Sequence, residues 1–118
     1  AGLREVAKMK PLTTLTIGSN KNITDAGLKD VAKLEKLTYL NLYYNKITDA
    51  GLKELTKCKK LEGLSLDSTQ ISDAGLKGLT KLAQLKGLRV QQTKVTKAGV
   101  VELQKALPNC LIIHNAKK

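Results

Sequence analysis

The sequence of 118 residues contains no Phe and no Trp, and it has only three Tyr. Aromatic rings therefore cannot anchor the core, and aliphatic side chains, led by 21 Leu, must fill it. Two Cys are too few for a disulfide framework, and a single His excludes any site that needs two histidines. No run of eighteen apolar residues occurs, so the sequence predicts no membrane-spanning helix.

Acidic residues are scarce as well, because ten Asp and Glu face 21 Lys and Arg. The formal net charge is +11, which favours acidic partners. The length fits one domain, and the apolar fraction of 42% is too high for a disordered tail.

The motifs of catalysis and cofactor binding are also missing. The sequence has no G-x-S-x-G element, no P-loop, no dinucleotide fingerprint and no metal-ligand spacing. We therefore expect a protein that is not an enzyme and that carries neither a cofactor nor a metal.

The dominant feature of the sequence is an internal repeat of about 24 residues. Complete copies cover residues 12–36, 37–60, 61–84 and 85–106. Residues 1–11 match only the second half of a repeat, and residues 107–118 match only the first half, followed by a tail. Because one repeat buries its apolar stripe only against its neighbours, we expect residues 1–118 to form a single domain.

Each repeat has two halves with different periodicity. The first half fits L-x-x-L-x-L-x-x-N/T, as in LTYLNLYYN from Leu37, and its alternation predicts a strand. The second half places apolar residues three apart, as in Leu28, Val31 and Leu34, which predicts a helix.

Polar residues mark the start of each expected helix. We expect the preceding hydroxyls to cap the helices and the Asp that follows to interact with the helix dipole, a pattern that Lys97 breaks. The hydroxyl residues are Thr24, Thr48, Ser72 and Thr96, and the acids are Asp25, Asp49 and Asp73.

This pattern resembles the leucine-rich repeat proteins. The helical half, I-T-D-A-G-L-K-x-L, is similar to that of the ribonuclease-inhibitor-like and cysteine-containing subclasses and of bacterial repeat arrays. The resemblance implies an α/β fold, a right-handed solenoid forming a horseshoe segment, with parallel strands on the concave face and helices on the convex face. It also implies that the residues in the ninth position hydrogen-bond the loop backbone between repeats: Asn20, Asn45, Thr69, Thr93 and Asn115. The resemblance implies a binding surface, but it does not identify a partner.

The two cysteines replace consensus leucines, Cys58 on a helix and Cys110 in the strand column of Leu88. Successive strands lie about 4.8 Å apart, and the two residues are at least two repeats apart. That separation exceeds the limit of about 7 Å between the Cα atoms of a disulfide. We therefore predict two buried free thiols.

In this family the third, fifth, seventh and eighth positions of the first half face the concave side. All three tyrosines then fall in one row, and Gly63 and Gly87 beside them would leave a shallow floor. Tyrosine offers a large, stiff and amphipathic contact area, so we predict a protein partner there, although strands also favour aromatic residues for their own packing. The candidate partner-binding residues are Tyr39, Asn41, Tyr43, Tyr44, Asp67, Arg89 and Gln91.

Leu111 and Ile113 are apolar at positions that are polar or aromatic in the other rows. One interpretation is an edge for self-association, which would give a weak dimer instead of a monomer. The other interpretation is a twisted last strand that folds under the tail.

Basic residues recur at two helical positions. They suggest a polyanion-binding face for nucleic acid, anionic lipid or an acidic polymer, or a solvated convex face with acidic neighbours at i,i+3 spacing. The candidates are Lys29, Lys33, Lys53, Lys57, Lys77 and Lys81.

The sequence thus predicts a non-catalytic protein–protein interaction module with a rigid concave surface and a tyrosine cluster. The alternatives are a basic scaffold for polyanions and a structural fragment of a larger array. Because Ala1 lies inside a repeat, we expect a signal segment, a lipid anchor or further repeats upstream. The cellular compartment stays open.

Overall fold

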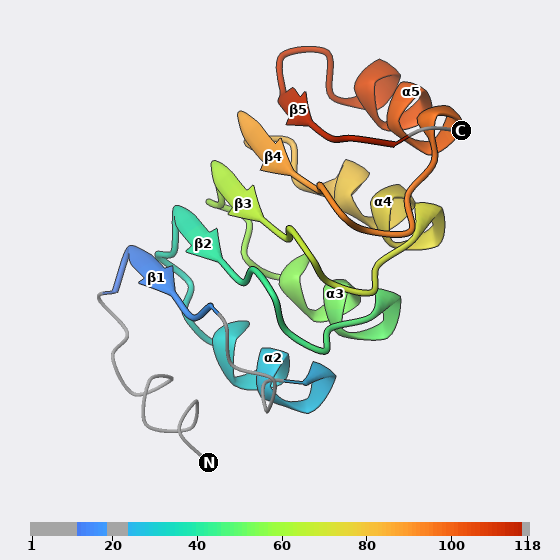
Figure 1. The fold of residues 1–118 in the computed structure, drawn as a ribbon. Coiled ribbons are helices and arrows are strands. Elements are labelled where there is room, and N and C mark those ends of the chain that lie inside the picture. The colour runs from blue at the N-terminus through green and yellow to red at the C-terminus, as the bar shows by residue number, and fades with distance from the viewer. Residues whose placement is uncertain (1–11, 19–23, 117–118) are drawn as a thin grey trace.

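The computed structural model describes residues 12–18 and 24–116, and all structural statements below refer to them. Short strands and helices alternate along the chain, with all strands on one side and all helices on the other (Figure 1). The strands are β1 (Thr14–Thr16), β2 (Tyr39–Asn41), β3 (Gly63–Ser65), β4 (Gly87–Arg89) and β5 (Leu111–Ile113). The helices are α2 (Asp25–Val31), α3 (Asp49–Leu55), α4 (Asp73–Gly78), the 3-10 turn η1 (Leu79–Lys81) and α5 (Lys97–Ala106).

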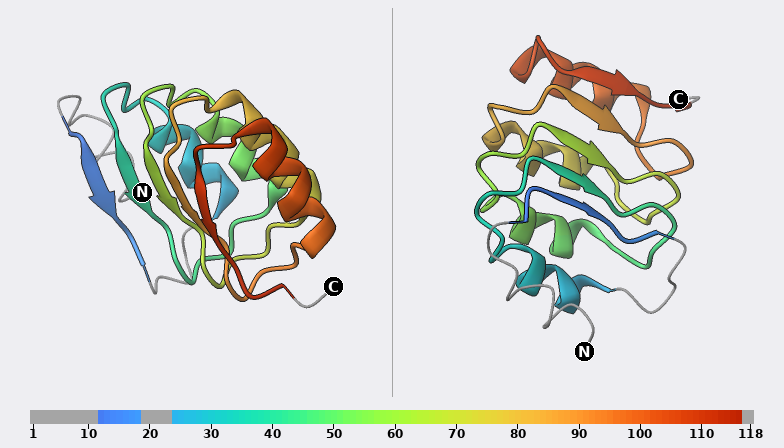
Figure 2. Two further views of the ribbon diagram at one scale, coloured as in Figure 1. Left: turned by 90° about the horizontal axis from the view of Figure 1, so that it is seen from above. Right: turned by 90° about the vertical axis from the view of Figure 1, so that its left-hand side faces the viewer.

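The strands form one parallel sheet in the order β1-β2-β3-β4-β5. Two views at right angles show the same stack, with each helix beside the helix of the next repeat (Figure 2). Thr14 pairs with Tyr39, Tyr39 with Gly63 and Gly63 with Gly87, so each strand adds one repeat. The predicted α/β solenoid of parallel strands and helices is confirmed.

The register of β5 corrects one sequence assignment. Leu88 pairs with Ile112, so the prediction that Cys110 shares its strand column is wrong. The cause is α5, which runs to Ala106 and continues into a cap where the backbone N–H of Leu107 donates to the carbonyl of Leu103 at 2.8 Å. Leu107 therefore ends a helix, and the strand begins two residues later than the motif LPNCLIIHN indicated.

Leucines dominate the core between the two layers. The strand column Leu40, Leu64 and Leu88 is buried, as are Leu42 and Leu66 beside it. The loop column Ile47, Ile71 and Val95 is buried as predicted, while Ile23 lies outside the described residues. Leu15, Ile17 and Ile112 are only partly buried against this core.

Both cysteines are buried and free, which confirms the predicted thiols. Burial removes water that would solvate a thiolate, and it raises the pKa of Cys58 to about 11. The pKa of Cys110 is raised for the same reason. Neither thiol is therefore activated for chemistry.

Contacts at the helix starts correct the predicted capping. The hydroxyl of Ser72 donates to Asp49 Oδ2 at 2.5 Å, and the Ser72 backbone N–H donates to Asp49 Oδ1 at 2.8 Å. The same two bonds link the following pairs: Thr48 to Asp25, and Thr96 to Asp73. Each hydroxyl thus serves mainly as a donor to the preceding repeat. We call these contacts the aspartate ladder.

Thr96 is the one residue of this set that also caps its helix, because its hydroxyl accepts from the Gly99 N–H at 3.2 Å. The side chains of Thr24, Thr48 and Ser72 make no capping hydrogen bond. Lys97 replaces the ladder aspartate in the last described helix.

The glycine of each D-A-G-L segment makes room for the ladder. A Cβ added at Gly51, Gly75 or Gly99 would overlap the carboxylate of the preceding repeat's aspartate. The glycine and the aspartate therefore form one inter-repeat contact.

Of the described residues assigned to the ninth position, Asn45 makes the expected bond between repeats, whereas Thr69 and Thr93 do not. The Asn45 side-chain amide donates to the carbonyls of Ile17 at 2.8 Å and Leu42 at 2.9 Å. Thr69 and Thr93 donate to carbonyls within their own repeats. Asn115 accepts from the Gln92 N–H of the preceding repeat, but the register of β5 aligns Asn115 with Gln91, so its assignment to the ninth position is wrong. Asn20 lies outside the described residues.

Candidate functional site

The concave face is built from two rows of side chains that cross the strands. The register aligns Tyr39, Gly63, Gly87 and Leu111 in the first row. Asn41, Ser65, Arg89 and Ile113 form the second row. Alternate residues of a strand face the same side, so both rows lie on one surface.

An apolar hollow of about 180 Å³ lies in the middle of this surface, and we call it the concave hollow. Tyr39 bounds it at one end, and Leu111 and Ile113 bound it at the other. The remaining lining residues are Gly63, Leu64, Ser65, Gly87, Leu88 and Arg89. The structure therefore unites one predicted tyrosine with the predicted self-association edge.

The two floor glycines of the hollow differ. A Cβ at Gly63 would lie 2.7 Å from Tyr39 Cδ1, so the tyrosine ring already covers that glycine. A Cβ at Gly87 would meet nothing within 4 Å, so the floor is open there. Leu111 has an exposed fraction of 67% and Tyr39 of 40%, so both walls face solvent.

The other two tyrosines lie outside the concave hollow. A Cβ at Gly18 would overlap the ring of Tyr43, so this ring lies over the β1 repeat, whereas the Tyr39 ring lies over the β3 repeat. The tyrosines share one repeat, as the sequence predicts, but Tyr39 and Tyr43 lean in opposite directions.

Tyr44 has a left-handed backbone, with φ of 59°, like Ser68 at 59° and Gln92 at 56°. This conformation costs an ordinary residue about 1–2 kcal/mol. It is held because the Tyr44 N–H donates to the Asp67 carbonyl at 2.8 Å. The Ser68 N–H donates equivalently to the Gln91 carbonyl. A bulky ring therefore projects from a turn whose backbone favours Gly or Asn.

Three of the predicted polar residues form one network at the rim of the hollow. Arg89 Nε donates to Asp67 Oδ2 at 2.9 Å, and Arg89 Nη2 donates to Gln91 Oε1 at 2.9 Å. The Gln91 backbone N–H donates to Asp67 Oδ1 at 2.7 Å. The guanidinium is thus held in place, while its Nη1 donors have no partner in the described chain.

Asn41 is used locally, because its Oδ1 accepts from the Tyr43 N–H at 3.2 Å. Its amide nitrogen has no protein partner among the described residues and faces the same surface as Ser65. The sequence placed Ser65 at a concave position but not among the candidate partner-binding residues, and the structure adds it to the lining of the concave hollow.

The basic residues follow the helices and the turns after them. Lys29, Lys53 and Lys77 are exposed in the last turns of α2, α3 and α4. The predicted i,i+3 pairs form between Lys33 and Asp30 at 3.4 Å and between Lys57 and Glu54 at 3.1 Å. An open hollow of about 460 Å³ between α2 and α3 is lined by Lys29, Ala32, Lys33, Glu54 and Lys57.

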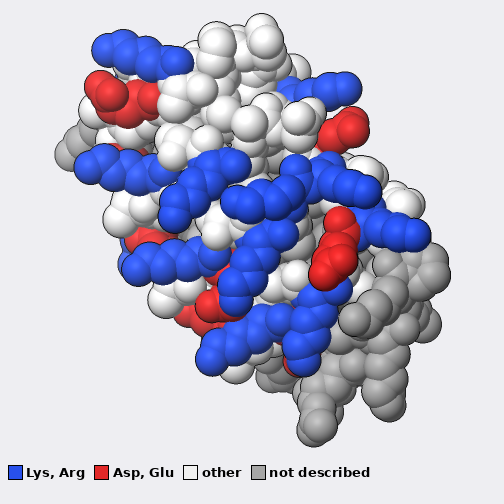
Figure 3. Space-filling view, turned by 180° about the vertical axis from the view of Figure 1, so that it is seen from behind, with Lys and Arg blue, Asp and Glu red and all other residues white. Residues whose placement is uncertain are grey.

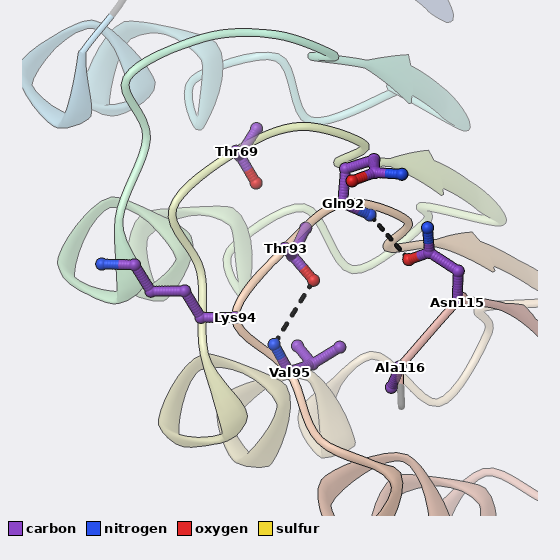
Figure 4. A pocket seen from close by; sticks show the side chains of 7 residues that line it. All are labelled: Thr69, Gln92, Thr93, Lys94, Val95, Asn115 and Ala116. Carbon is purple, nitrogen blue, oxygen red and sulfur yellow. Dashed lines mark hydrogen bonds between the residues drawn. The ribbon is translucent and has the colours of Figure 1, made fainter. Parts of the chain in front are cut away.

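A further hollow of about 570 Å³ lies beside the turns that follow β3 and β4 (Figure 4). Its polar groups mostly hold these turns together, since the Gln92 N–H donates to Asn115 Oδ1 at 2.8 Å and the Thr93 hydroxyl donates to the Val90 carbonyl. Lys94 points away from Gln92 and Asn115 (Figure 4). We therefore assign this hollow a structural role.

A groove of about 930 Å³ separates α4 from α5 on the convex face, with Leu76, Ala98 and Leu103 among its lining residues. Within residues 12–18 and 24–116, no three His, Cys, Asp or Glu side chains gather in a group that could hold a metal ion. The described helices also include none that is long and apolar enough to cross a membrane.

Stacked parallel strands, an outer helix layer and a polar ladder between repeats define a repeat solenoid that presents a strand surface. The leucine-rich repeat family model matches residues 10–71, more than half of the chain. The chain belongs to the leucine-rich repeat family. The particular subtype suggested by the sequence remains a prediction. No curated protein matches the sequence.

Solved structures share the fold at low sequence identity. Internalin C2 from Listeria monocytogenes is 24% identical, with a TM-score of 0.74, over 96% of this chain and 47% of that chain. The chain therefore spans about half the length of internalin C2. Leiomodin-1 actin-binding site 2 is 16% identical, with a TM-score of 0.73, over 99% of this chain and 79% of that chain.

A plant peptide hormone receptor, RGFR1, solved in complex with RGF2, is also similar. It is 16% identical, with a TM-score of 0.59, over 96% of this chain and 19% of that chain. Leucine-rich repeat domains generally mediate protein–protein interactions and are generally non-enzymatic scaffolds.

Proposed function

We propose that this chain is a non-catalytic module that binds a partner protein through its concave face. The observation that carries the proposal is the concave hollow, because an apolar, solvent-open depression on a rigid sheet suits an inserted side chain. The walls are Tyr39 on one side and Leu111 with Ile113 on the other.

The size of the hollow supports a single anchor residue. A volume of about 180 Å³ suits one aliphatic or small aromatic side chain. Full burial of a Leu or Ile side chain contributes roughly 1.5–3 kcal/mol, so one anchor supplies a modest share of the binding free energy. The remainder must come from contacts around the hollow.

The rim offers those contacts with little loss of side-chain freedom. Arg89 is fixed by Asp67 and Gln91, so binding to its free Nη1 donors requires little further ordering. Tyr43 extends the surface toward the β1 repeat, where a longer partner would reach it, and Tyr44 in the same repeat is exposed.

Filling the floor of the hollow tests the proposal. A Gly87→Leu variant would occupy the open floor, and the backbone tolerates it because Gly87 has no positive φ and no neighbour within 4 Å of its Cβ position. Gly78→Leu is the matched control, since Gly78 lies at the end of α4 and its Cβ position is equally free. Circular dichroism confirms that both variants fold.

The assay is capture of binding proteins from an extract of the cells that make this protein. We expect a protein that is retained by the native chain and by Gly78→Leu but is lost with Gly87→Leu. Equal retention by all three chains would contradict binding through the concave hollow.

A further inference from the structure

Basic side chains gather on a face that is neither concave nor convex. Seen from behind, Lys and Arg cover the middle and lower part of the molecule, whereas the top centre is white (Figure 3). This side carries the turns that lead from each helix to the next strand (Figures 1 and 2). The repeat pattern alone places the basic residues on the helical half of each repeat.

Three of these turns carry the charge. The segments 32–38, 56–62 and 79–86 contain seven Lys against two Glu, Glu35 and Glu62. The fourth turn, residues 107–110, has no charged residue, in agreement with the white area at the top centre of Figure 3. We define the basic edge as Lys33, Lys36, Lys57, Lys59, Lys60, Lys81 and Lys86.

Acidic neighbours neutralise only part of the basic edge. Lys33 and Lys57 pair with acids of their own helices, and Lys86 Nζ lies 3.6 Å from Glu62 Oε1. The other four lysines are exposed and have no acidic partner within the described chain: Lys36, Lys59, Lys60 and Lys81. Four unpaired cations on adjacent repeats therefore face solvent together.

The surroundings of these lysines decide which polyanion fits. The exposed large apolar residues of the described chain are Tyr39, Tyr43, Tyr44, Val101 and Leu111, and none belongs to the three turns. The basic edge therefore has no side chain to insert into a lipid bilayer, the second signal that stable membrane attachment needs. It also has no aromatic ring for stacking bases and no arginine for reading base edges.

We propose that the basic edge binds the phosphate backbone of a nucleic-acid duplex without reading its sequence. Lysine ammonium groups act as point charges toward phosphates, and release of condensed counterions drives such binding. The interaction uses a different face from the concave hollow, so it does not depend on the proposed protein partner.

Salt dependence measures the number of phosphate contacts. Each contact contributes about −0.9 to the slope of log K against log salt concentration on duplex DNA. The four unpaired lysines together therefore contribute about −3.6 to that slope. Sequence-independent binding of this kind has a Kd of about 10⁻⁴–10⁻⁶ M at physiological salt.

The experiment is fluorescence anisotropy with two 20-base-pair DNA duplexes of unrelated sequence, across a salt series. One variant replaces Lys36, Lys59, Lys60 and Lys81 with Gln. The matched control replaces four other exposed lysines that have no acidic partner in the described chain, Lys29, Lys53, Lys77 and Lys97, so both variants have the same net charge. Circular dichroism shows whether both keep the fold.

We expect the basic-edge variant to lose most of the slope and at least tenfold in affinity, while the control keeps a slope close to that of the native chain. Glu62→Gln removes an acid from the edge and frees Lys86, so we expect it to steepen the slope by about one contact. Equal losses in the two lysine variants would show binding by net charge alone and would overturn the proposal. Tighter binding to phosphatidylserine vesicles than to either duplex would also overturn it, and so would a tenfold preference between the two DNA sequences.

Discussion

The contact between Gly75 and Asp49 allows a demanding test of how the repeats hold together. A Gly75→Ala variant places a Cβ against the Asp49 carboxylate, 3.2 Å from Asp49 Cγ and 2.9 Å from Leu52 Cδ2. The carboxylate cannot move away freely, because both of its oxygens accept hydrogen bonds from Ser72. A methyl group at position 75 should therefore break the bonds at this point of the aspartate ladder.

The expected magnitude follows from the bonds that are lost. A hydrogen bond to a charged group contributes about 1.5–3 kcal/mol, and two such bonds are at stake. Replacing Gly by Ala inside a helix gains at most about 1 kcal/mol, which offsets part of the loss. We therefore expect Gly75→Ala to lower the free energy of unfolding by about 2–5 kcal/mol.

Asp49→Ala separates this explanation from a general intolerance of position 75. The single variant should be destabilised by a similar amount, because Ser72 loses both of its acceptors. In the Asp49→Ala background the methyl group at position 75 keeps only the 2.9 Å contact with Leu52 Cδ2, the end of a flexible side chain, so Gly75→Ala should cost clearly less than in the native chain. Gly78→Ala is the control, since its Cβ position is free of neighbours.

Urea unfolding followed by circular dichroism and by tyrosine fluorescence provides the assay. At an m value of about 1–3 kcal/mol/M, a loss of about 3 kcal/mol lowers the midpoint by roughly 1–3 M. Agreement between the two probes is required, because repeat arrays can unfold in stages. An equal cost of Gly75→Ala in both backgrounds would refute the ladder contact as its cause.

Three further predictions concern the backbone, the core and the loops. Gln92→Gly relieves a φ of 56° and should raise the free energy of unfolding by about 0.5–1 kcal/mol in urea. The Cys58 pKa of about 11 lies above the unfolded value of 9.0, so the folded chain keeps a proton that the unfolded chain loses. Stability should therefore fall by about 2 kcal/mol as pH rises from 9 to 11, and comparison with Cys58→Ala isolates this term. Asn45→Ala leaves the Ile17 and Leu42 carbonyls without their donor and should lower the thermal midpoint, equivalent to about 1–3 kcal/mol.

The fold could be predicted because the same strand and helix periodicities recur in four successive repeats. The strand positions of Leu40, Leu64 and Leu88 follow from the alternation and from the 24-residue step, and all three residues are buried. The exception is the last strand, where LPNCLIIHN fits the strand motif while Leu107 actually caps α5. The motif does not show that α5 is ten residues long, whereas α2 and α3 have seven, and the longer helix moves the start of the last strand.

The predicted helix capping was wrong because the sequence shows which residues are neighbours along the chain and not which residues meet between repeats. Thr48 and Asp49 together resemble a local capping pair. The Thr48 hydroxyl instead donates a hydrogen bond to Asp25 of the preceding repeat. The constant D-A-G spacing could have indicated this contact. A glycine that recurs in the first turn of a helix suggests that another group approaches the backbone closely there.

The sequence predicted most residues of the candidate site, but it did not predict which of them lie together. Tyr39, Leu111 and Ile113 were each singled out, but their union in one hollow depends on the register of β5 with β4. The opposite leans of Tyr39 and Tyr43 depend on side-chain rotamers against Gly63 and Gly18, which no sequence pattern reports.

Photo-crosslinking from the wall of the concave hollow tests the central claim most directly. A photo-reactive phenylalanine analogue replaces Tyr39 in one chain and Val101, which is 51% exposed on α5, in a second chain. The captured partner should form a covalent adduct with the chain labelled at position 39 and none with the chain labelled at position 101. Adducts from position 101 alone, or equal yields from both positions, would contradict recognition through the concave face.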